Sequence, residues 1–312
     1  MTARRPASRT DPDRAPWRAS CVALEGALDA AGADLESRLT AWAGRWNGVL
    51  SHHHAPGILA WAVTGSADDD GAARESFRSE FDPALAGLHG VAQTAFVTGP
   101  AAAPGPKAFA FDVDSTLIEE EVIELLAARA GSLEEVASVT AAAMRGELDF
   151  AASLTRRVAT LRGLETSALG EVAAQVTPTT GAVAFIRRAV SGGHAVGAVS
   201  GGFEEVLAPH SAEWGLTAHL ANALETEDGR LTGRVTGEIV TAETKRRFLL
   251  SLGDETTRAR IAVGDGANDL EMVRAADVGV ALCAKPVLAE AADVRLDVRH
   301  LGALEAIVCM DA

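Results

Sequence analysis

Two aspartates, Asp112 and Asp114, directly follow a short apolar segment about one third of the way along this 312-residue chain. If that segment is a strand, both carboxylates can reach one cleft where the chain leaves the extended conformation. One carboxylate could then attack an electrophile, while the other moves a proton to the leaving group and from an attacking water. An Asp-rich turn in which Asp114 or Ser115 caps a following helix explains the same residues. Both interpretations are open at this point.

Other polar segments could complete a site for a phosphorylated ligand. Asp265, within the glycine-rich segment 264–269, follows another apolar run and could share a hard divalent cation with Asp112. Ser200 precedes two glycines, whose exposed N–H groups suit a phosphate at a helix N-terminus. Lys245 could supply a fixed positive charge. Each feature also has an ordinary explanation, either a capped turn or a solvated lysine.

The elements that must position these residues alternate between strands and helices. Three apolar segments end in polar, glycine-rich turns: 107–112, 194–200 and 260–265. Helical patterns lie between them, for example over 182–191 and 243–252. This alternation predicts a parallel, doubly wound α/β sheet, in which ligands bind at the carboxyl ends of the strands. Residues 119–177 are almost purely helical and form a candidate lid.

The first third of the chain has a different pattern. Residues 1–20 combine five arginines with proline and serine and lack an apolar run, which predicts a disordered tail rather than a secretory signal. A transit peptide is disfavoured by acidic residues and prolines. Residues 21–99 predict a small α+β module, with helices over 22–50 and 72–88 and strands over 58–63 and 91–97. The proline-rich segment 100–106 predicts an extended linker.

Composition limits the partners. Lys and Arg number 28 against 43 Asp and Glu, and the net charge of −15 disfavours nucleic acid and anionic membranes. No stretch approaches the roughly 20 apolar residues that a bilayer span requires. The three cysteines are far apart, which disfavours disulfides and zinc and favours a reducing cytoplasm. A homodimer is a further expectation.

In this order the motifs resemble the haloacid dehalogenase superfamily of phosphotransferases, and within it the phosphoserine phosphatases. The similarity covers Lys107 to the C-terminus, about two thirds of the chain. The matching segments are 112–116, 119–121, 144–150, 153–158, 177–179, 200–203, 221–222, 231–235, 264–269 and 283–286. The resemblance implies a Rossmann-like core with a helical cap inserted after the first core strand.

The resemblance also implies roles for the catalytic residues. Asp112 would be the nucleophile that forms an aspartyl-phosphate, and Asp114 the general acid and then base. Mg²⁺ would be held by Asp112, Asp265 and the main-chain carbonyl of Asp114. These roles agree with the chemistry expected of the pair, because metal and lysine charge would offset the repulsion between an anionic nucleophile and a phosphate.

Substrate contacts follow from the same resemblance. Ser200, Gly201 and Lys245 would hold the phosphate oxygens, Asn268 would orient the phosphate, and Asp269 would support the loop or Lys245. In the lid, Glu121 and Arg157 match residues that bind the substrate ammonium and carboxylate. A plain surface salt bridge is the alternative for that pair. Met144 and Phe150 would pack over the substrate or form the core of the lid.

The expected activity is therefore Mg²⁺-dependent hydrolysis of O-phospho-L-serine, the last step of serine biosynthesis. One alternative is a related phosphatase or phosphotransferase acting on another small phosphomonoester. The other is an amino-acid sensor whose core has lost activity, which the intact aspartates and lysine disfavour. Related enzymes often carry an extra N-terminal domain, in some cases an amino-acid-binding ACT module. An ACT-like regulatory role is thus suggested for residues 21–99, although no motif fixes it.

Overall fold

The computed structural model describes residues 15–28 and 31–311 of the chain. The described residues divide into two compact units. One unit extends to Pro104 and includes Ala303–Cys309, and the other contains Gly105–Gly302 and the chain end from Met310. Within the described residues, no helix is both long and apolar enough to cross a membrane.

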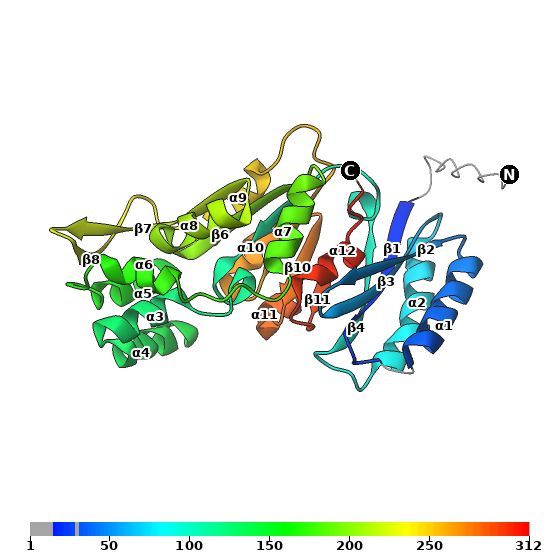
Figure 1. Cartoon of the computed structure of the whole chain (residues 1–312), viewed down its shortest axis with the longest axis horizontal. Coiled ribbons are helices and arrows are strands. Elements are labelled where there is room, and N and C mark those ends of the chain that lie inside the picture. The colour runs from blue at the N-terminus through cyan, green and yellow to red at the C-terminus, as the bar shows by residue number, and fades with distance from the viewer. Residues whose placement is uncertain (1–14, 29–30, 312) are drawn as a thin grey trace. The chain divides into compact units, whose positions relative to one another are not determined.

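The N-terminal unit is a four-stranded antiparallel sheet with two helices (Figure 1). Its elements, in chain order, are β1 (Ala15–Leu24), α1 (Ala31–Arg45), β2 (Val49–Ala55), β3 (Ile58–Ala67), α2 (Asp70–Leu85) and β4 (Ala92–Thr98). The strand order β2-β3-β1-β4 gives the βαββαβ arrangement of ferredoxin-like domains. The expected α+β module is therefore present.

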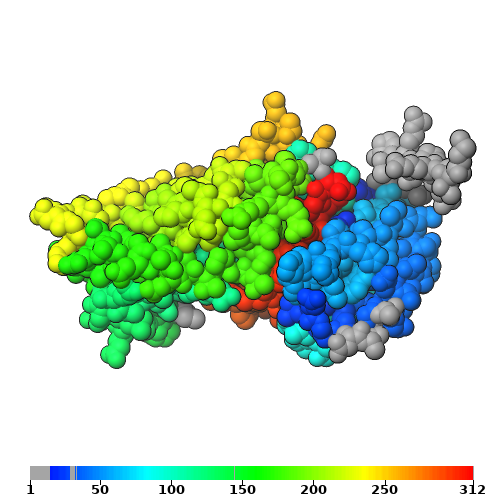
Figure 2. All heavy atoms as spheres, in the orientation of Figure 1, coloured from blue at the N-terminus to red at the C-terminus, as the bar shows by residue number. Residues whose placement is uncertain are grey.

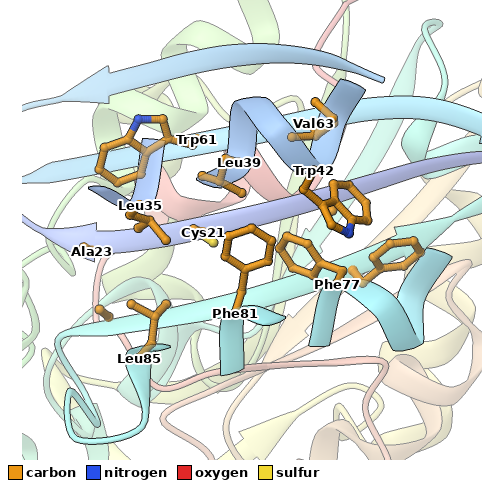
Figure 3. Close-up of a cluster of buried hydrophobic side chains, with 14 of the residues drawn as sticks. Cys21, Ala23, Leu35, Leu39, Trp42, Trp61, Val63, Phe77, Phe81 and Leu85 are labelled. Carbon is orange, nitrogen blue, oxygen red and sulfur yellow. The ribbon is translucent and has the colours of Figure 1, made fainter. Parts of the chain in front are cut away.

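Strand β1 corrects the expected disordered tail of residues 1–20. Residues 15–20 form the first part of β1, whereas residues 1–14 lie outside the described part of the chain. Alternate residues of β1, among them Trp17, join the core shared with α1 and α2. Figure 3 shows Cys21 of this strand among the side chains of that core. Trp42, Phe77 and neighbouring aromatic rings fill this core with edge-on and tilted contacts.

The expected helix over 22–50 is wrong at both ends. Strand β1 continues to Leu24, a turn with Gly26 at φ 82° follows, and α1 spans only Ala31–Arg45 before β2 begins. The segment 100–106 is also not wholly extended, because Gly99–Ala102 forms a 3₁₀ turn in which Ala101 and Ala102 are buried.

The end of the chain corrects a second boundary. Residues 107–312 were expected in the phosphatase core, yet Ala303–Cys309 belong to the N-terminal unit. Helix α12 (Leu304–Ile307) is buried against the four-stranded sheet. The Arg18 guanidinium, on β1, donates from Nε to the Ala306 carbonyl at 2.6 Å and from Nη2 to the Glu305 carbonyl at 3.2 Å. Apolar burial and these bonds together explain the placement.

The second unit is built on a seven-stranded sheet of order β11-β10-β9-β5-β6-β7-β8. Its strands are β5 (Lys107–Phe111), β6 (Ala195–Phe203), β7 (Ala218–Glu227), β8 (Arg230–Thr236), β9 (Ala259–Gly264), β10 (Val278–Leu282) and β11 (Val294–Leu296). Only β8 is antiparallel to its neighbour. Its crossover helices are α7 (Ala182–Ser191), α8 (Glu204–Trp214), α9 (Ala242–Ser251), α10 (Leu270–Ala275) and α11 (Pro286–Ala289). The predicted α/β fold with a parallel core is confirmed.

Three adjacent strands carry the predicted chemistry. In the order β9-β5-β6, all three run parallel, so their carboxyl ends lie at one edge of the sheet. Asp112 follows β5 and donates its backbone N–H to Val263 of β9 at 2.9 Å. Ser200 lies near the end of β6, and Asp265 directly follows β9. The sheet register therefore brings the polar segments together.

The helices between β5 and α7 form a cap, which we define as α3 (Val122–Ala130), α4 (Leu133–Met144), α5 (Phe150–Ala159) and α6 (Ser167–Ala173). Its entry and exit are paired, because Glu119 donates its backbone N–H to the Thr177 carbonyl at 3.0 Å. Hairpin β7–β8 lies beside the cap, where Gly163 donates to the Leu231 carbonyl at 2.8 Å. The green cap and the yellow hairpin meet in Figure 2.

Candidate active site

A buried lysine between two aspartates forms the floor of the candidate site. Lys245 of α9 places Nζ 2.5 Å from Oδ1 of Asp112 and 2.7 Å from Oδ1 of Asp269. Thr241 caps α9 by accepting the N–H of Thr244, which fixes the start of the helix one turn before the lysine. Burial by itself would lower the pKa of Lys245, but the two aspartates raise it. The ammonium group therefore stays charged.

Carboxylate oxygens of Asp112, Asp265 and Asp269 lie within 4.8 Å of one another. Burial raises the pKa of Asp112, and Asp269 raises it further against the opposing effect of Lys245. Burial also raises the pKa of Asp265, with Lys285 opposing. The single positive charge of the buried Lys245 is therefore too small to balance the negative charges of the three carboxylates. A donor set made only of carboxylates, with too little positive charge nearby, fits a hard divalent cation.

Within the acidic cluster, Asp269 supports the other two aspartates. Its Oδ1 accepts from Lys245, and its Oδ2 accepts the backbone N–H groups of Asp265 and Gly266, both at 3.1 Å. By contrast, both hydrogen bonds to Asp112 fall on Oδ1, from Lys245 and from the N–H of Val113. Asp112 and Asp265 are therefore the side chains best placed to hold a cation.

Asp114 occupies a tight turn over Val113–Leu117, two residues beyond Asp112. Its Oδ1 accepts the N–H of Val122 at 3.4 Å, and a Cβ added at Gly202 would lie only 2.9 Å from its Oδ2. Burial raises the pKa of Asp114 to about 7, and the Glu121 carboxylate adds to the rise. A carboxyl group with a pKa near neutrality is suited to donate and accept a proton.

A cavity of about 580 Å³ lies over these groups, between the sheet edge and the cap. Eight of the residues predicted from the sequence line it: Asp112, Asp114, Glu121, Phe150, Arg157, Gly201, Asp265 and Asn268. The close approach of cap and core depends on glycine, because a Cβ at Gly201 would lie 2.8 Å from Cζ of Phe150. Asp149 caps α5 by accepting the N–H of Ala152 and so fixes where Phe150 begins that helix.

Two opposite charges face this cavity from the cap. Glu121 precedes α3, and its Oε1 accepts from the Ser115 hydroxyl at 2.9 Å. Arg157 lies on α5, and its Nε is buried without a hydrogen-bond partner in the structure. Burial lowers the pKa of Arg157, while Glu121, Asp114 and Glu124 oppose that effect. A half-buried arginine whose Nε is buried without a hydrogen-bond partner is suited to bind an anionic ligand.

Three predicted residues do not line the cavity as described. Ser200 is buried, and its hydroxyl accepts the N–H of Gly202 at 2.7 Å, within a strand that continues to Phe203 rather than at a helix N-terminus. Lys245 lies beneath the cavity floor, where it contacts Asp112 instead of open space. Met144 ends α4, but its side chain lies outside the described part of the structure.

Two charged residues of the cavity were not predicted as site residues. Glu124 lies one turn after Glu121, and the helical i, i+3 spacing could have indicated that they share a face. Lys285 places Nζ 3.7 Å from Oδ2 of Asp265. It follows β10, whose carboxyl end lies at the same edge as that of β9, so the strand pattern was the available signal.

Comparisons with known proteins agree with this geometry. The family model for haloacid dehalogenase-like hydrolase matches residues 109–274, more than half of the chain. Phosphoserine phosphatase of Streptomyces coelicolor is 54% identical over 194 residues, which cover 61% of this chain and 47% of that protein. The chain thus matches about half the length of this relative.

Solved structures share the fold. A hydrolase of the same family from Salmonella enterica serovar Typhi superposes with a TM-score of 0.74 at 26% identity, covering 94% of this chain and 99% of that one. A substrate-bound phosphoserine phosphatase complex gives 0.60 at 36% identity, covering 66% of this chain and 100% of that one. On the family match and the acidic site at the strand ends, this chain belongs to the haloacid dehalogenase-like hydrolases.

Proposed function

We propose that this chain hydrolyses O-phospho-L-serine to L-serine and phosphate, with Mg²⁺ as cofactor. One observation carries the proposal: the unpartnered Arg157 and the carboxylate of Glu121 line the same cavity as Asp112 and Asp114. The names of the Streptomyces relative and of the substrate-bound structure support it. In serine biosynthesis this reaction would be the final step.

The charges of the cavity complement the two ends of phosphoserine. A guanidinium can bind a carboxylate with two parallel hydrogen bonds, and a carboxylate can accept from an ammonium group. With the amino-acid end between Arg157 and Glu121, the phosphate would lie toward Asp112 and Gly201. A substrate without a carboxylate at this end would leave the buried Nε of Arg157 without a hydrogen-bond partner.

In the first proposed step, a carboxylate oxygen of Asp112 attacks phosphorus, and the bond between phosphorus and the serine oxygen breaks. Asp114 donates its proton to that departing oxygen, for which its pKa of about 7 is suitable. Lys245 holds Asp112 in position through Oδ1. The product of this step is an aspartyl-phosphate on Asp112 and free serine.

In the second step a water attacks the phosphorus of the aspartyl-phosphate, and Asp114 takes up the proton of that water. Phosphate leaves, and Asp112 and Asp114 return to their starting states. Mg²⁺, held by Asp112 and Asp265 and in our proposal by the Asp114 carbonyl, would neutralise charge on the phosphate oxygens. Asn268 would orient the phosphate from the loop after β9.

The convergence of the acidic residues favours an enzyme over an inactive sensor. A sensor has no need of a buried lysine that contacts the carboxylate of Asp112, or of a second carboxyl group with a pKa near 7. A related phosphatase with another small phosphomonoester as substrate would share these groups. The cap residues decide between the two, because only an amino-acid substrate uses both Glu121 and Arg157.

The test is Arg157→Ala, assayed by phosphate release from phosphoserine and from p-nitrophenyl phosphate. Arg157 would contact only the amino-acid end, so kcat/KM for phosphoserine should fall tens- to several-hundredfold, about 2–4 kcal/mol. Hydrolysis of p-nitrophenyl phosphate should change little, because it depends on Asp112 and the metal.

Arg156→Ala is the matched control. Arg156 neighbours Arg157 on α5, is exposed and does not line the cavity, so this variant should keep both activities. Equal losses on both substrates in the folded Arg157 variant would exclude the phosphoserine assignment. A panel of phosphomonoesters, assayed with and without Mg²⁺, would then identify the alternative substrate.

Three expectations accompany this proposal. Location in the cytoplasm and a homodimer remain predictions, which cell fractionation and analytical ultracentrifugation would test. The ferredoxin-like topology of the N-terminal unit is compatible with an ACT-like regulatory role. Measuring serine binding to the whole chain by calorimetry would test that role.

A further inference from the structure

Ser115 has an unusual conformation beside the catalytic pair. Its φ is 59°, in the left-handed region that disfavours residues with a side chain. Among the described residues other than glycine, only Asn47, Asp228 and Cys283 share a positive φ. Strained backbone of this kind persists only where surrounding interactions hold it.

Every polar group of Ser115 is engaged. Its backbone N–H donates to the Glu120 carbonyl at 3.2 Å, and its own carbonyl accepts from Nη2 of Arg299 at 3.1 Å. Its hydroxyl donates to Oε1 of Glu121 at 2.9 Å. Arg299 and the backbone of the cap entrance therefore hold the strained turn in the conformation that aims the hydroxyl at Glu121.

The Glu121 carboxylate has no other hydrogen-bond donor in the described part of the chain, although it lines the cavity. One oxygen is fixed by Ser115, and the other is left for a ligand. Without the hydroxyl, the side chain of Glu121 could rotate freely about its own bonds, and a bound cationic group would have to order it.

We propose that Ser115 is a positioning residue that orients Glu121 toward the ammonium group of the substrate and so contributes to substrate choice. This inference rests on the proposed function, in which Glu121 receives that ammonium group. It adds that the specificity of the cap is set in part by the turn that carries the catalytic aspartates.

The test is Ser115→Gly, which removes the CH2OH side chain and with it the hydroxyl that contacts Glu121, while glycine adopts a φ of 59° without strain. Two substrates are compared: O-phospho-L-serine, and 3-phosphoglycerate, which has a hydroxyl in place of the ammonium group. For phosphoserine, kcat/KM should fall about tenfold, mainly through KM, since a hydrogen bond to a charged group is lost. For 3-phosphoglycerate the change should stay within about twofold.

A double variant distinguishes a positioning role of Ser115 from a general disturbance of the site. In Glu121→Gln, adding Ser115→Gly should cause no further loss on phosphoserine, because the group that Ser115 orients is already changed. A full additional tenfold loss in that background, or equal losses on both substrates, would overturn the inference and leave the proposed function standing. If the wild-type chain does not prefer phosphoserine to 3-phosphoglycerate, both the proposed function and this inference fail.

Discussion

Lys245 contacts two of the three clustered aspartates, so the buried charges of the site do not balance. Asp112 and Asp269 share one ammonium group, and Asp265 has only the distant Nζ of Lys285 at 3.7 Å. The raised pKa values of Asp112 and Asp265 express the same imbalance, in which burial outweighs the nearby positive charge. A buried carboxylate with too little positive charge beside it is a better nucleophile toward phosphorus and binds a cation more readily.

Asp112→Asn should separate activity from stability. The amide is nearly isosteric but a poor nucleophile, so kcat should fall at least about a thousandfold. Burial raises the pKa of Asp112 above its ordinary value in the native state, so the charged form of this carboxyl group costs stability. Without metal, the variant should therefore be more stable than the wild type, on the order of 1 kcal/mol.

Chemical denaturation in EDTA and single-turnover assays would check both parts. Deamidation back to Asp must be excluded by mass spectrometry, since it restores activity. A variant that keeps more than about one per cent of wild-type kcat would contradict the nucleophile role. A clear loss of stability would contradict the charge argument.

Metal binding should be measurable without substrate. Mg²⁺ at a hundredfold excess over its Kd should stabilise the wild type by about 2.7 kcal/mol, and EDTA should remove the effect. Asp265→Asn should lose most of this gain. Ca²⁺ should also bind yet support little turnover, because it takes more oxygen ligands, roughly 6–8, and would draw both oxygens of Asp112 to itself. Unchanged activity in excess EDTA would refute the metal assignment.

At the level of elements, the core could be predicted from the sequence and the N-terminal unit only in part. Strands β5 and β9 are buried on both faces, so they read as apolar runs followed at once by polar residues. That pattern located Asp112 and Asp265. Their mutual distances could not be predicted, because strand order is a property of the whole sheet.

Strand β1 shows why the rest was missed. Arg18, which suggested a basic tail, is buried by α12, and its partner Ala306 is 288 residues away in the sequence. No local pattern reports a contact of that range. The surroundings of Ser200 were hard to predict for a related reason, since the pairing of β6 with β7 shifts between Val199 and Phe203, and only the sheet shows that α8 begins at Glu204.

His194 joins three elements and predicts a pH effect on stability. Its Nδ1 accepts the N–H of Lys107 at the start of β5, and its Nε2 pairs with the Met310 carbonyl at 3.0 Å. Burial lowers the pKa of His194, and the Met310 carbonyl only partly opposes it. The neutral form is favoured in the native state, because protonated Nδ1 would face the N–H of Lys107.

The unfolded chain therefore binds this proton more readily than the native one. The contribution of His194 to the free energy of unfolding is complete above the ordinary pKa of histidine, about 6.5. As the pH falls below that value, the contribution is lost by at most about 1.4 kcal/mol per pH unit. His194→Gln should flatten the stability profile between about pH 6.5 and 5. Urea unfolding across this range would measure it, with the exposed His89→Gln as the control. Parallel profiles for wild type and His194→Gln would contradict the assignment.

At the scale of the whole molecule, the chain passes between its two units three times: after Pro104, after Gly302 and after Cys309. The N-terminal unit is therefore discontinuous in sequence, although all residues assigned to the reaction lie between Asp112 and Asp269 in the other unit. A fragment ending at Pro104 would lack α12, which covers the sheet and accepts from Arg18.

Arg18→Ala should therefore destabilise the N-terminal unit without affecting the chemistry. The guanidinium donates to Ala306, Glu305 and, at 2.7 Å, to the Thr64 hydroxyl, so its loss leaves buried acceptors unpaired and should cost about 2–4 kcal/mol. Arg18→Lys should recover only part of this, because an ammonium group cannot form the same fork. Arg78→Ala, at an exposed position on α2, is the matched control. Calorimetry should show one unfolding transition at a lower temperature than in the wild type. Below that temperature, phosphoserine turnover should be unchanged. Two results would show that α12 does not act as a local support of the N-terminal sheet. One is that the Arg18→Ala variant unfolds at the same temperature as the wild type. The other is that it loses turnover while the chain is still folded.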